Sequence, residues 1–317
     1  MDLQKSKQLY PFYQKELVPE IELLEQDRKK IVKKMTIVGV VLVALVIPCF
    51  FIFEEIDSMI FPVVIAAVIF AGLLHYFSKD YACEFKENVL RKIVEYIDPN
   101  LVYTPTFCIS EGQFQSSGIF RKGIDRYKGD DHVEGTIGAT KIEFSEIHAE
   151  YVTRDSKGRT SNHTIFKGLF FIGDFNKHFK TDTYVLPDQA ERFLGSIGGM
   201  LQGINKQYGE LIKMEDPVFE KEFVVYGEDQ IEARYILSPA LMERITKFRK
   251  KSGQRISLSF KGSKVYIAIP FSKNLFEPSI FSTILDFKPV KEFFDDFALM
   301  IDIVEDLNLN TRIWTKK

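Results

Sequence analysis

The stretch "KIEFSEIHAEYVTRDSKGRTSNHTIFKGLFFIGDF", residues 141–175, decides the fold class because it contains two strand-like arms joined by a polar tip. Aromatic and β-branched residues fill both arms, whereas the tip at residues 154–161 holds Asp, Ser, Lys and Gly, which are typical of turns. The pattern predicts a long antiparallel hairpin.

Further strand signals continue on both sides of this hairpin. The segment "DHVEGTI", residues 131–137, leads into it across Gly138 and Ala139. A second hairpin is expected from "QRISLSF" and "KVYIAIP", which lie within residues 254–270. Shorter strands are expected at residues 183–186 and within "FEKEFVVYG", residues 219–227.

Helices are expected in separate blocks. Asp229 and Ser238 have the side chains that cap helix N-termini, and Gly253 ends the helix that follows Ser238. Residues 289–307 carry apolar side chains at helical spacing, whereas residues 188–208 predict only a weak helix because glycines interrupt the pattern. Because strands and helices are segregated, the predicted class is α+β with a mostly antiparallel sheet.

Two apolar runs precede this domain. "MTIVGVVLVALVIPCFFIF", residues 35–53, and "MIFPVVIAAVIFAGLLHYF", residues 59–77, contain no Lys, Arg, Asp or Glu. As helices, such runs would each extend about 28 Å, close to the hydrocarbon thickness of a bilayer. A helix in a soluble core normally keeps a polar stripe, and these runs have none. We therefore predict a transmembrane hairpin of two spans.

The basic residues around these runs predict their orientation. The positive-inside rule places Lys- and Arg-rich flanks in the cytoplasm, and the loop at residues 54–58 contains neither residue type. Both ends of the chain are therefore expected in the cytoplasm, with Glu54, Glu55 and Asp57 in a tight turn on the far side. The flanking cations are Arg28, Lys29, Lys30, Lys33, Lys34, Lys79, Lys86, Arg91 and Lys92.

This organisation predicts five consecutive parts, with a possible subdomain seam at Asp216-Pro217. Apolar residues between Tyr81 and Tyr96 recur at helical spacing, and we expect this stripe to pack on the N-terminal helix rather than on the membrane surface. The predicted parts are an N-terminal cytosolic helical segment (1–34), the transmembrane hairpin (35–77), a juxtamembrane amphipathic helix and linker (78–106), a strand-rich half (107–214) and an α+β half (215–317) of the cytosolic domain.

The amino-acid composition limits the kinds of molecule that the protein is predicted to bind. The formal net charge is −2 and the pI is about 6.3, so no nucleic-acid partner is predicted. Three cysteines, one of them inside an apolar run, fit a reducing compartment without disulfides. The sequence contains no HExxH, CxxC, GxSxG or GxxxxGK[ST] motif, and no cofactor is predicted. The expected partners are the lipid bilayer and a protein.

One group of residues in the long hairpin is a candidate site. Glu146, His148 and Glu150 alternate and so share one face of a strand. If the turn centres on Ser156-Lys157, Glu150 faces His163 and Glu146 faces Lys167. These carboxylates and imidazoles could then bind a divalent metal or act in acid–base catalysis. The alternative is cross-strand charge pairing, and a shift of one residue would move His163 to the other face.

Three blocks of the sequence resemble a known family. They are "IEFSEIHAEYVTRDSKGR", "TIFKGLFFIGDFNKHF" followed by "YVLPD", and "FEKEFVVYGEDQIEARYILSPALMER". Together they resemble the bacterial proteins grouped as domain of unknown function 3137, over residues 78–307. The resemblance implies a bacterial inner-membrane protein with two spans ahead of the domain, and it implies no catalytic residues.

Two classes of function follow. The first is a membrane-anchored cytosolic interaction or scaffold domain. The alternative is a membrane-anchored hydrolase or metal-dependent enzyme that uses the Glu/His strand face. A transporter is disfavoured because the apolar runs hold no charged residue. Phe271, Phe276 and Phe281 lie in a loop-like stretch that could form an apolar contact surface or fold back over the core.

Overall fold

The computed structural model describes residues 3–52, 56–175, 177–188 and 207–310. The chain divides into two compact units: a sheet unit formed by Val94–Leu275 and Asp295–Lys317, and a helical unit formed by Asp2–Ile93 and Phe276–Phe294. Most of the weak helix expected at residues 188–208 lies outside the described residues.

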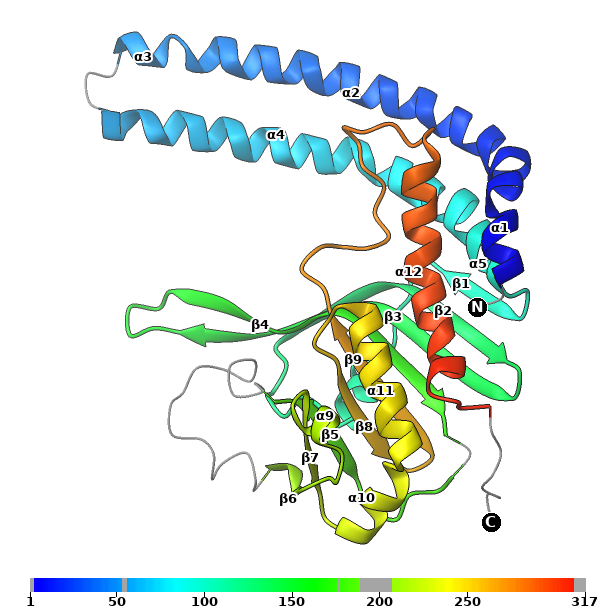
Figure 1. The fold of residues 1–317 in the computed structure, drawn as a ribbon. Helices are drawn as coiled ribbons and strands as arrows, with labels where there is room; N and C mark the ends of the chain where they lie inside the picture. Colours follow the sequence, from blue (N-terminus) through cyan, green and yellow to red (C-terminus); the bar gives the residue numbers. More distant parts are fainter. Residues whose placement is uncertain (1–2, 53–55, 176, 189–206, 311–317) are drawn as a thin grey trace. The chain divides into compact units, whose positions relative to one another are not determined.

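The sheet unit contains a nine-stranded sheet in the order β1-β2-β3-β4-β9-β8-β5-β7-β6, in which every pair is antiparallel (Figure 1). The α+β class and the three expected hairpins, β2–β3, β3–β4 and β8–β9, are confirmed. The strands are β1 (Leu101–Thr104), β2 (Arg126–Ile137), β3 (Thr140–Arg154), β4 (Thr160–Asp174), β5 (Thr183–Pro187), β6 (Glu210–Ile212), β7 (Phe223–Gly227), β8 (Ser257–Lys261) and β9 (Lys264–Pro270).

The helices of this unit begin at the expected caps. Asp229 accepts hydrogen bonds from the first turn of α10 (Gln230–Ile236), and Ser238 caps α11 (Pro239–Ser252), which ends at Gly253 in the left-handed conformation. The short helix α6 (Glu111–Ser116) was not predicted, although Ser110 and Gln113 form a complete capping box. The remaining helices are α5 (Arg91–Ile97), α9 (Pro217–Glu220) and α12 (Phe287–Asp306), of which α5 and α12 each contribute residues to both units.

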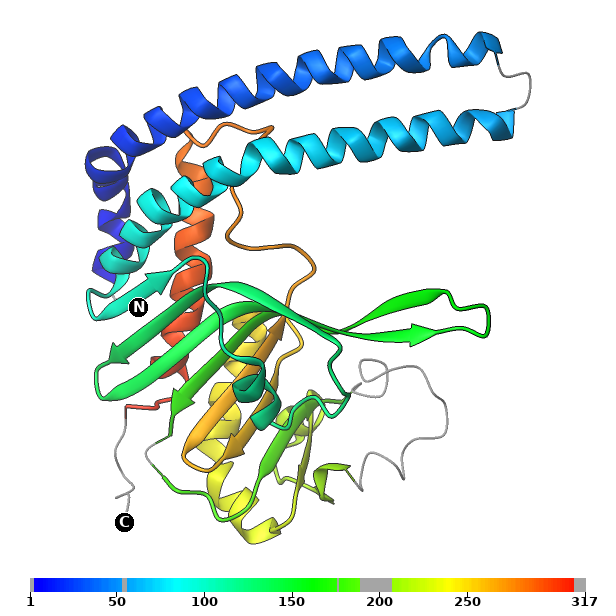
Figure 2. The same cartoon turned by 180° about the vertical axis from the view of Figure 1, so that it is seen from behind.

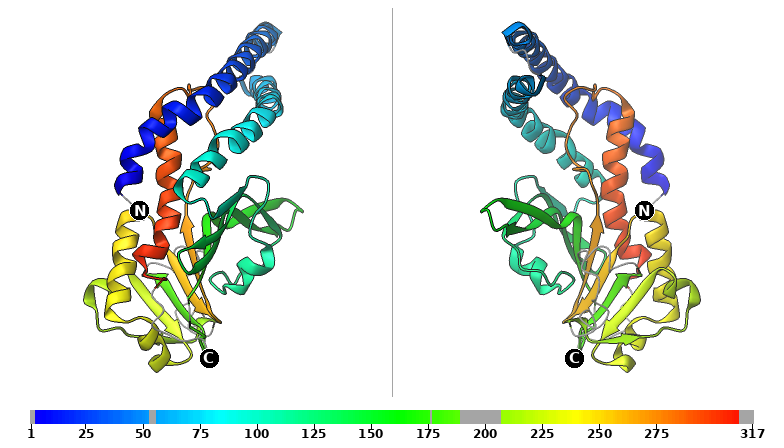
Figure 3. Two further views of the ribbon diagram at one scale, coloured as in Figure 1. Left: turned by 90° about the vertical axis from the view of Figure 1, so that its right-hand side faces the viewer. Right: turned by 90° about the vertical axis from the view of Figure 1, so that its left-hand side faces the viewer.

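Each face of the sheet buries aromatic side chains. On one face the C-terminal half of α12 packs through Phe297, whose ring centroid lies 5.8 Å from that of Tyr103 and 6.4 Å from that of Phe144. Lys251 on α11 lies 3.0 Å from Asp302 on α12, so both helices cover this face (Figure 3). The opposite face is covered by α6 and the loop around it, with Phe114 packed on Phe170 (Figure 2).

The helical unit begins with long, nearly continuous helices: α1 (Leu3–Phe12), a π-helical turn (Tyr13–Leu17), α2 (Val18–Val46), α3 (Cys49–Ile52), α4 (Ile56–Phe85) and a second π-helical turn (Lys86–Leu90) that leads into α5. One continuous helix, Ile60–Ile97, is long and apolar enough to cross a membrane, and none of its apolar window is buried inside the protein. Among the described residues it is the one helix with these properties.

A segment from the C-terminal part of the chain completes this unit. We call residues 276–286 the strap. Phe276 at its start is fully buried, and the Arg28 Nη1 donates a hydrogen bond of 2.7 Å to the Ile280 carbonyl. The Tyr13 hydroxyl donates to the Leu285 carbonyl. The strap therefore fastens to the N-terminal helices through residues that are far from it in sequence.

The amphipathic stripe that follows α4 is also buried in this unit. Tyr81, Phe85, Val89 and Ile93 are each at most 2% exposed. Lys92 lies 3.0 Å from Glu20 on α2, which places the stripe against the N-terminal helix as expected.

Candidate functional site

The strand register of hairpin β3–β4 differs from the register that was assumed for the predicted Glu/His face. Glu150 pairs with Thr164 and not with His163, and Glu146 pairs with Leu169 and not with Lys167. The loop spans residues 155–159, because the Asp155 Oδ1 accepts hydrogen bonds from the backbone of both Lys157 and Arg159. A register shift at Ala149/Glu150 adds one residue to β4.

His163 therefore lies on the other face of the hairpin from Glu150. Its ring stacks on Tyr151, with centroids 4.8 Å apart and an interplanar angle of 18°, and its Nε2 lies 2.8 Å from the Thr153 hydroxyl. Lys122 Nζ lies 4.5 Å from the Tyr151 ring centroid. These contacts indicate a structural role in the hairpin and separate His163 from the three residues predicted to share a site with it.

His148 and Glu150 do lie close together. The His148 Nε2 is 3.5 Å from the Glu150 carboxylate and 3.4 Å from the Thr164 hydroxyl. Burial lowers the pKa of His148, and the Lys128 and Lys167 charges lower it further against the opposing effect of Glu150. The imidazole is therefore mainly neutral near pH 7. His148 and Glu150 lie on the same strand, β3, so theirs is not the predicted cross-strand pairing, and the contact of His148 that crosses the hairpin is the one with Thr164.

Glu146 points into a different cluster. It is 6% exposed, and its Oε2 accepts a hydrogen bond of 3.0 Å from the Leu275 backbone. Ligand atoms of Glu146, Asp130 and Asp131 all lie within 4.8 Å of one another. Asp131 is 1% exposed, has φ of 56° at a β-bulge, and accepts a hydrogen bond from the Tyr103 hydroxyl.

This carboxylate cluster has the oxygen donors that a hard divalent cation prefers. Two of its members also hold the surrounding backbone and side chains in place, as the contacts to Leu275 and Tyr103 show. The adjacent residues Asp130 and Asp131 were the only sequence signal for it, and only the pairing of β2 with β3 brings Glu146 beside them.

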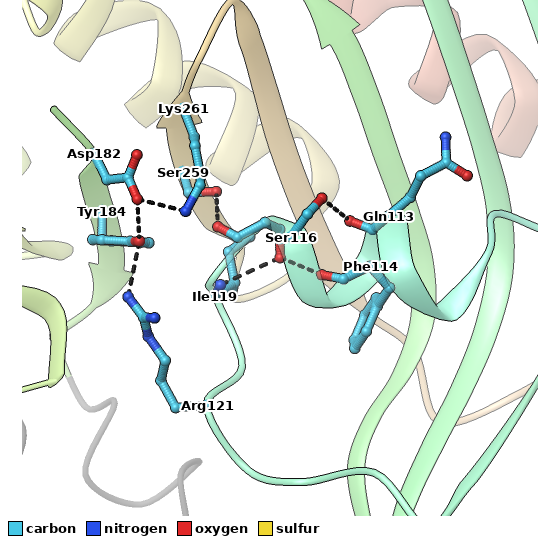
Figure 4. Close-up of polar contacts among 10 residues, drawn as sticks. Gln113, Phe114, Ser116, Ile119, Arg121, Asp182, Tyr184, Ser259 and Lys261 are labelled. Atoms are coloured by element: carbon cyan, nitrogen blue, oxygen red, sulfur yellow. Dashed lines mark hydrogen bonds and ion pairs between the residues drawn. The ribbon is translucent and has the colours of Figure 1, made fainter. Parts of the chain in front are cut away.

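A second polar network lies beside β5 and was not predicted. Figure 4 shows Asp182 between Lys261 at the end of β8 and Tyr184 on β5. The Asp182 Oδ2 lies 2.7 Å from the Lys261 Nζ and accepts a hydrogen bond of 3.0 Å from the Tyr184 hydroxyl. The Arg121 Nη2 donates to the same hydroxyl at 2.9 Å. The network thus joins two cations, one carboxylate and one phenol.

Tyr184 and the neighbouring Tyr208 remain protonated at neutral pH. Burial raises the pKa of Tyr184, and the charge of Asp182 raises it further. Burial likewise raises the pKa of Tyr208 to about 12. Arg121 lies over both rings, 5.2 Å from the Tyr184 centroid and 5.1 Å from that of Tyr208. This geometry favours a structural role, in which Arg121 holds its loop in position on the sheet. It does not favour a role in acid–base catalysis.

The loop that carries Arg121 is itself held on the sheet. The Ser259 hydroxyl on β8 donates a hydrogen bond of 2.7 Å to the Ser117 carbonyl, and the Tyr208 hydroxyl donates one of 2.7 Å to the Ile119 carbonyl. Gly118 between them has φ of 67°, and a Cβ there would lie 2.7 Å from the Tyr184 hydroxyl. Close approach to Tyr184 therefore requires glycine at this position.

The outer part of hairpin β3–β4 forms a free two-stranded ribbon, which we define as residues 151–164. The neighbouring strand β2 last pairs at Glu150, and β9 last pairs at Gly168. Among the described residues, the ribbon strands therefore pair only with each other. Figures 1 and 2 show the ribbon extending beyond the rest of the sheet. Apart from the Val152 N–H, which donates a hydrogen bond of 2.7 Å to the Asp125 carboxylate, the outer edges have backbone groups that could pair with another strand.

Comparisons with known proteins add a family and one distant structural likeness. A comparison with curated proteins found no match. A solved structure of the mycobacterial trehalose monomycolate transport factor A, TtfA, is similar at 10% identity and a TM-score of 0.33, covering 68% of this chain and 96% of that one. At this TM-score we draw nothing from the likeness.

The family model described as "Protein of unknown function (DUF3137)" matches residues 164–309. This segment includes the second and third of the sequence blocks that carried the resemblance, but not the first block. The match therefore begins at residue 164, later than the expected residue 78. It covers the sheet from β4 to β9 and reaches beyond α12. Residues 164–309 of this chain therefore match the DUF3137 family model, which agrees with the resemblance seen in the sequence.

Proposed function

We propose that this protein is a membrane-anchored interaction protein. Residues 35–53 and 59–77 form a hairpin of two spans in a bacterial inner membrane, and the segments before and after it lie in the cytoplasm. The cytosolic sheet unit binds a partner protein through the free ribbon, residues 151–164. It acts by recruitment or scaffolding and not by catalysis.

Exposed apolar side chains support the two-span anchor. On α2 they lie within the first apolar run, except for Leu23, and on α4 they begin at Ile60. Water would solvate such surfaces poorly, whereas lipid tails would cover them at no cost in hydrogen bonds, because the helices satisfy their own backbone groups. Within the two apolar runs, the large apolar residues more than 50% exposed are Ile37, Val40, Val41, Val43, Leu45, Ile47, Phe51, Ile60, Phe61, Val64, Val68 and Tyr76.

The free edges of the ribbon carry the proposal of partner binding. A protruding pair of strands exposes unpaired backbone donors and acceptors, and an extended peptide can add to such an edge as a further strand. The side chains at the tip are mainly polar, and three of them, Arg154, Lys157 and Arg159, are cationic and exposed. A partner with an acidic or polar extended segment fits this surface best.

Cysteine accessibility tests the anchor. In a variant with Cys49 and Cys108 replaced by Ser, the exposed Cys83 should react with a membrane-impermeant maleimide only after cell lysis. In a variant that also has C83S and S58C, the new thiol in the predicted outer loop should react in intact cells. The opposite pattern of labelling would contradict the orientation, and labelling of both thiols in intact cells would contradict the anchor.

Photo-crosslinking tests the ribbon. A photoreactive residue at Ser161 should give one adduct of constant mass in living cells. A shortened variant that lacks Val152, Thr153, Ser161 and Asn162 removes two residues from each strand and so keeps the alternation of faces. With the photoreactive residue at Thr164, the shortened variant should lose the adduct that the full-length ribbon gives. An adduct that persists at equal yield would contradict the ribbon as the binding element.

The metal-dependent alternative has one observation in its favour, the carboxylate cluster of Asp130, Asp131 and Glu146. The predicted Glu/His face contributes only Glu146 to it. If this cluster binds metal, the purified protein should contain a stoichiometric divalent cation that is lost in D130N but retained in the double variant H148Q/H163Q. Metal-free protein with full partner crosslinking would favour the interaction function.

A further inference from the structure

The helical unit contains an apolar groove along α2. Its volume is about 550 Å³, within the range of ligand-binding pockets. Met35, Gly39, Val43 and Ile47 lie along one face of α2 and form its floor, Phe70 on α4 forms one wall, and Phe281 of the strap forms another. Three segments that are distant in sequence thus enclose one apolar surface.

We propose that this groove binds one acyl chain of an anionic phospholipid whose phosphate contacts Lys29 and Lys33 at the cytoplasmic end of the groove. This inference rests on the proposed function, because it requires residues 35–53 to lie in the bilayer.

The length and composition of the groove fit an acyl chain. From Met35 to Ile47 the floor extends about 18 Å along the helix, compared with about 15 Å for the hydrocarbon of one leaflet. Gly39 keeps the middle of the floor low, because a Cβ there would lie 3.6 Å from the Phe70 ring and longer side chains would project into the groove. A protein side chain of ordinary length would fill only part of such a channel.

Charge at one end of the groove selects the headgroup. Lys29 and Lys33 precede the groove residues Val32 and Thr36 by three positions, so they lie one turn further toward the cytoplasm on the same side of α2. Lys33 is exposed, and the Lys29 side chain is 67% exposed. Lys29 lies 3.8 Å from Glu25 but stays mostly exposed, whereas Arg28 is 11% exposed and is held by both Glu25 and the Ile280 carbonyl. The two lysines therefore offer positive charge where a lipid phosphate would lie.

Phe281 marks the level of the membrane interface. It is 65% exposed although it borders an apolar groove, whose lining also includes Met35 and Thr36, where the apolar run begins. Aromatic residues are enriched at this level of membranes because their rings tolerate both apolar and hydrated surroundings. A lipid in the groove would cover the Phe281 ring and so connect the strap to the bilayer.

Labelling with a photoactivatable lipid tests the proposal. The full chain is reconstituted in vesicles of phosphatidylcholine and phosphatidylglycerol that contain phosphatidylglycerol with a diazirine on its acyl chain. We expect label on Phe281 and on residues 39–43. The variant G39L should reduce this label at least fivefold, whereas V41L, a matched change outside the groove lining, should leave it unchanged. The double variant K29Q/K33Q should lose the preference for phosphatidylglycerol over phosphatidylcholine as competitor.

Each contrary outcome has a distinct meaning. Equal labelling in G39L and the parent would overturn the groove as a lipid site, as would equal competition by the two lipids in the parent. If the anchor itself were wrong, no residue between 35 and 77 would be labelled and alkaline carbonate would release the protein from membranes. Failure of the groove and failure of the proposed function are therefore distinguishable.

Discussion

The Lys86 ammonium lies 2.8 Å from the Glu277 carboxylate, and this ion pair links the helical segment after α4 to the strap. The Lys86 side chain is 7% exposed and the Glu277 side chain 39% exposed. Water reaches one partner only, so the pair is neither a surface salt bridge nor a fully buried one. Removal of the Glu277 charge should leave the buried Lys86 ammonium with less electrostatic stabilisation.

We expect E277Q to lower the free energy of unfolding by about 1–2 kcal/mol, less than the loss of a fully buried pair because Glu277 is partly solvated. Thermal unfolding in detergent measures this change. E16Q is the control, because the Glu16–Lys15 pair is exposed and should contribute less than about 0.5 kcal/mol. Equal effects of the two variants would show that the strap gains nothing from Lys86.

Gly118 allows Tyr184 to approach the loop that carries Arg121. We expect G118A to destabilise the protein by about 2 kcal/mol or more, because alanine is strained at φ of 67° and its Cβ would meet the Tyr184 hydroxyl. G123A is the matched control, since a Cβ at Gly123 meets nothing within 4 Å. Chemical denaturation of the two variants measures the difference, and similar midpoints would contradict the close approach.

His148 should make stability depend on pH. Burial lowers its pKa in the folded state, so the unfolded chain, with an ordinary pKa of about 6.5, binds more protons at mildly acidic pH. The contribution of neutral His148 is therefore present above about pH 6.5 and is lost as the pH falls below it. The variant H148Q should show a flatter decline of melting temperature between about pH 7 and 5. An unchanged decline would assign the pH dependence to other groups.

Tyr81 has a buried hydroxyl without a hydrogen-bond partner among the described residues. Burial raises its pKa, so the phenol stays neutral beside Arg28 and Glu25. Because an unsatisfied buried hydroxyl is costly, Y81F should unfold at the same temperature as the parent or higher, with a gain of up to about 1 kcal/mol. A loss of stability, measured in the same detergent, would show that the hydroxyl makes a favourable contact. Y76F, at a 73% exposed position, is the control.

The sequence alone was sufficient for features that depend on neighbouring residues. The three hairpins, the caps at Asp229 and Ser238, and the left-handed Gly253 follow from turn residues and side-chain periodicity, which act over a few positions. The apolar composition of residues 59–77 likewise predicted a helix able to cross a membrane. The other span, residues 35–53, remains a prediction from composition.

Only the tertiary structure decided the features that depend on distant residues. The side chain of Asp155 fixed the loop at residues 155–159, and the resulting shift of one residue moved His163 away from the predicted face. Glu232, in the first turn of α10, accepts hydrogen bonds from the backbone of Lys180 and Thr181, which no local pattern predicts.

The same holds for the strand order and the strap. The pairing of β5 between β8 and β7, and the return of residues 276–286 to the N-terminal helices, leave no local pattern in the sequence. Such contacts form because each apolar face must be buried somewhere, and many distant partners offer similar burial per unit area. Periodicity identifies which face is buried, but the complementary shape of the whole chain selects what covers it.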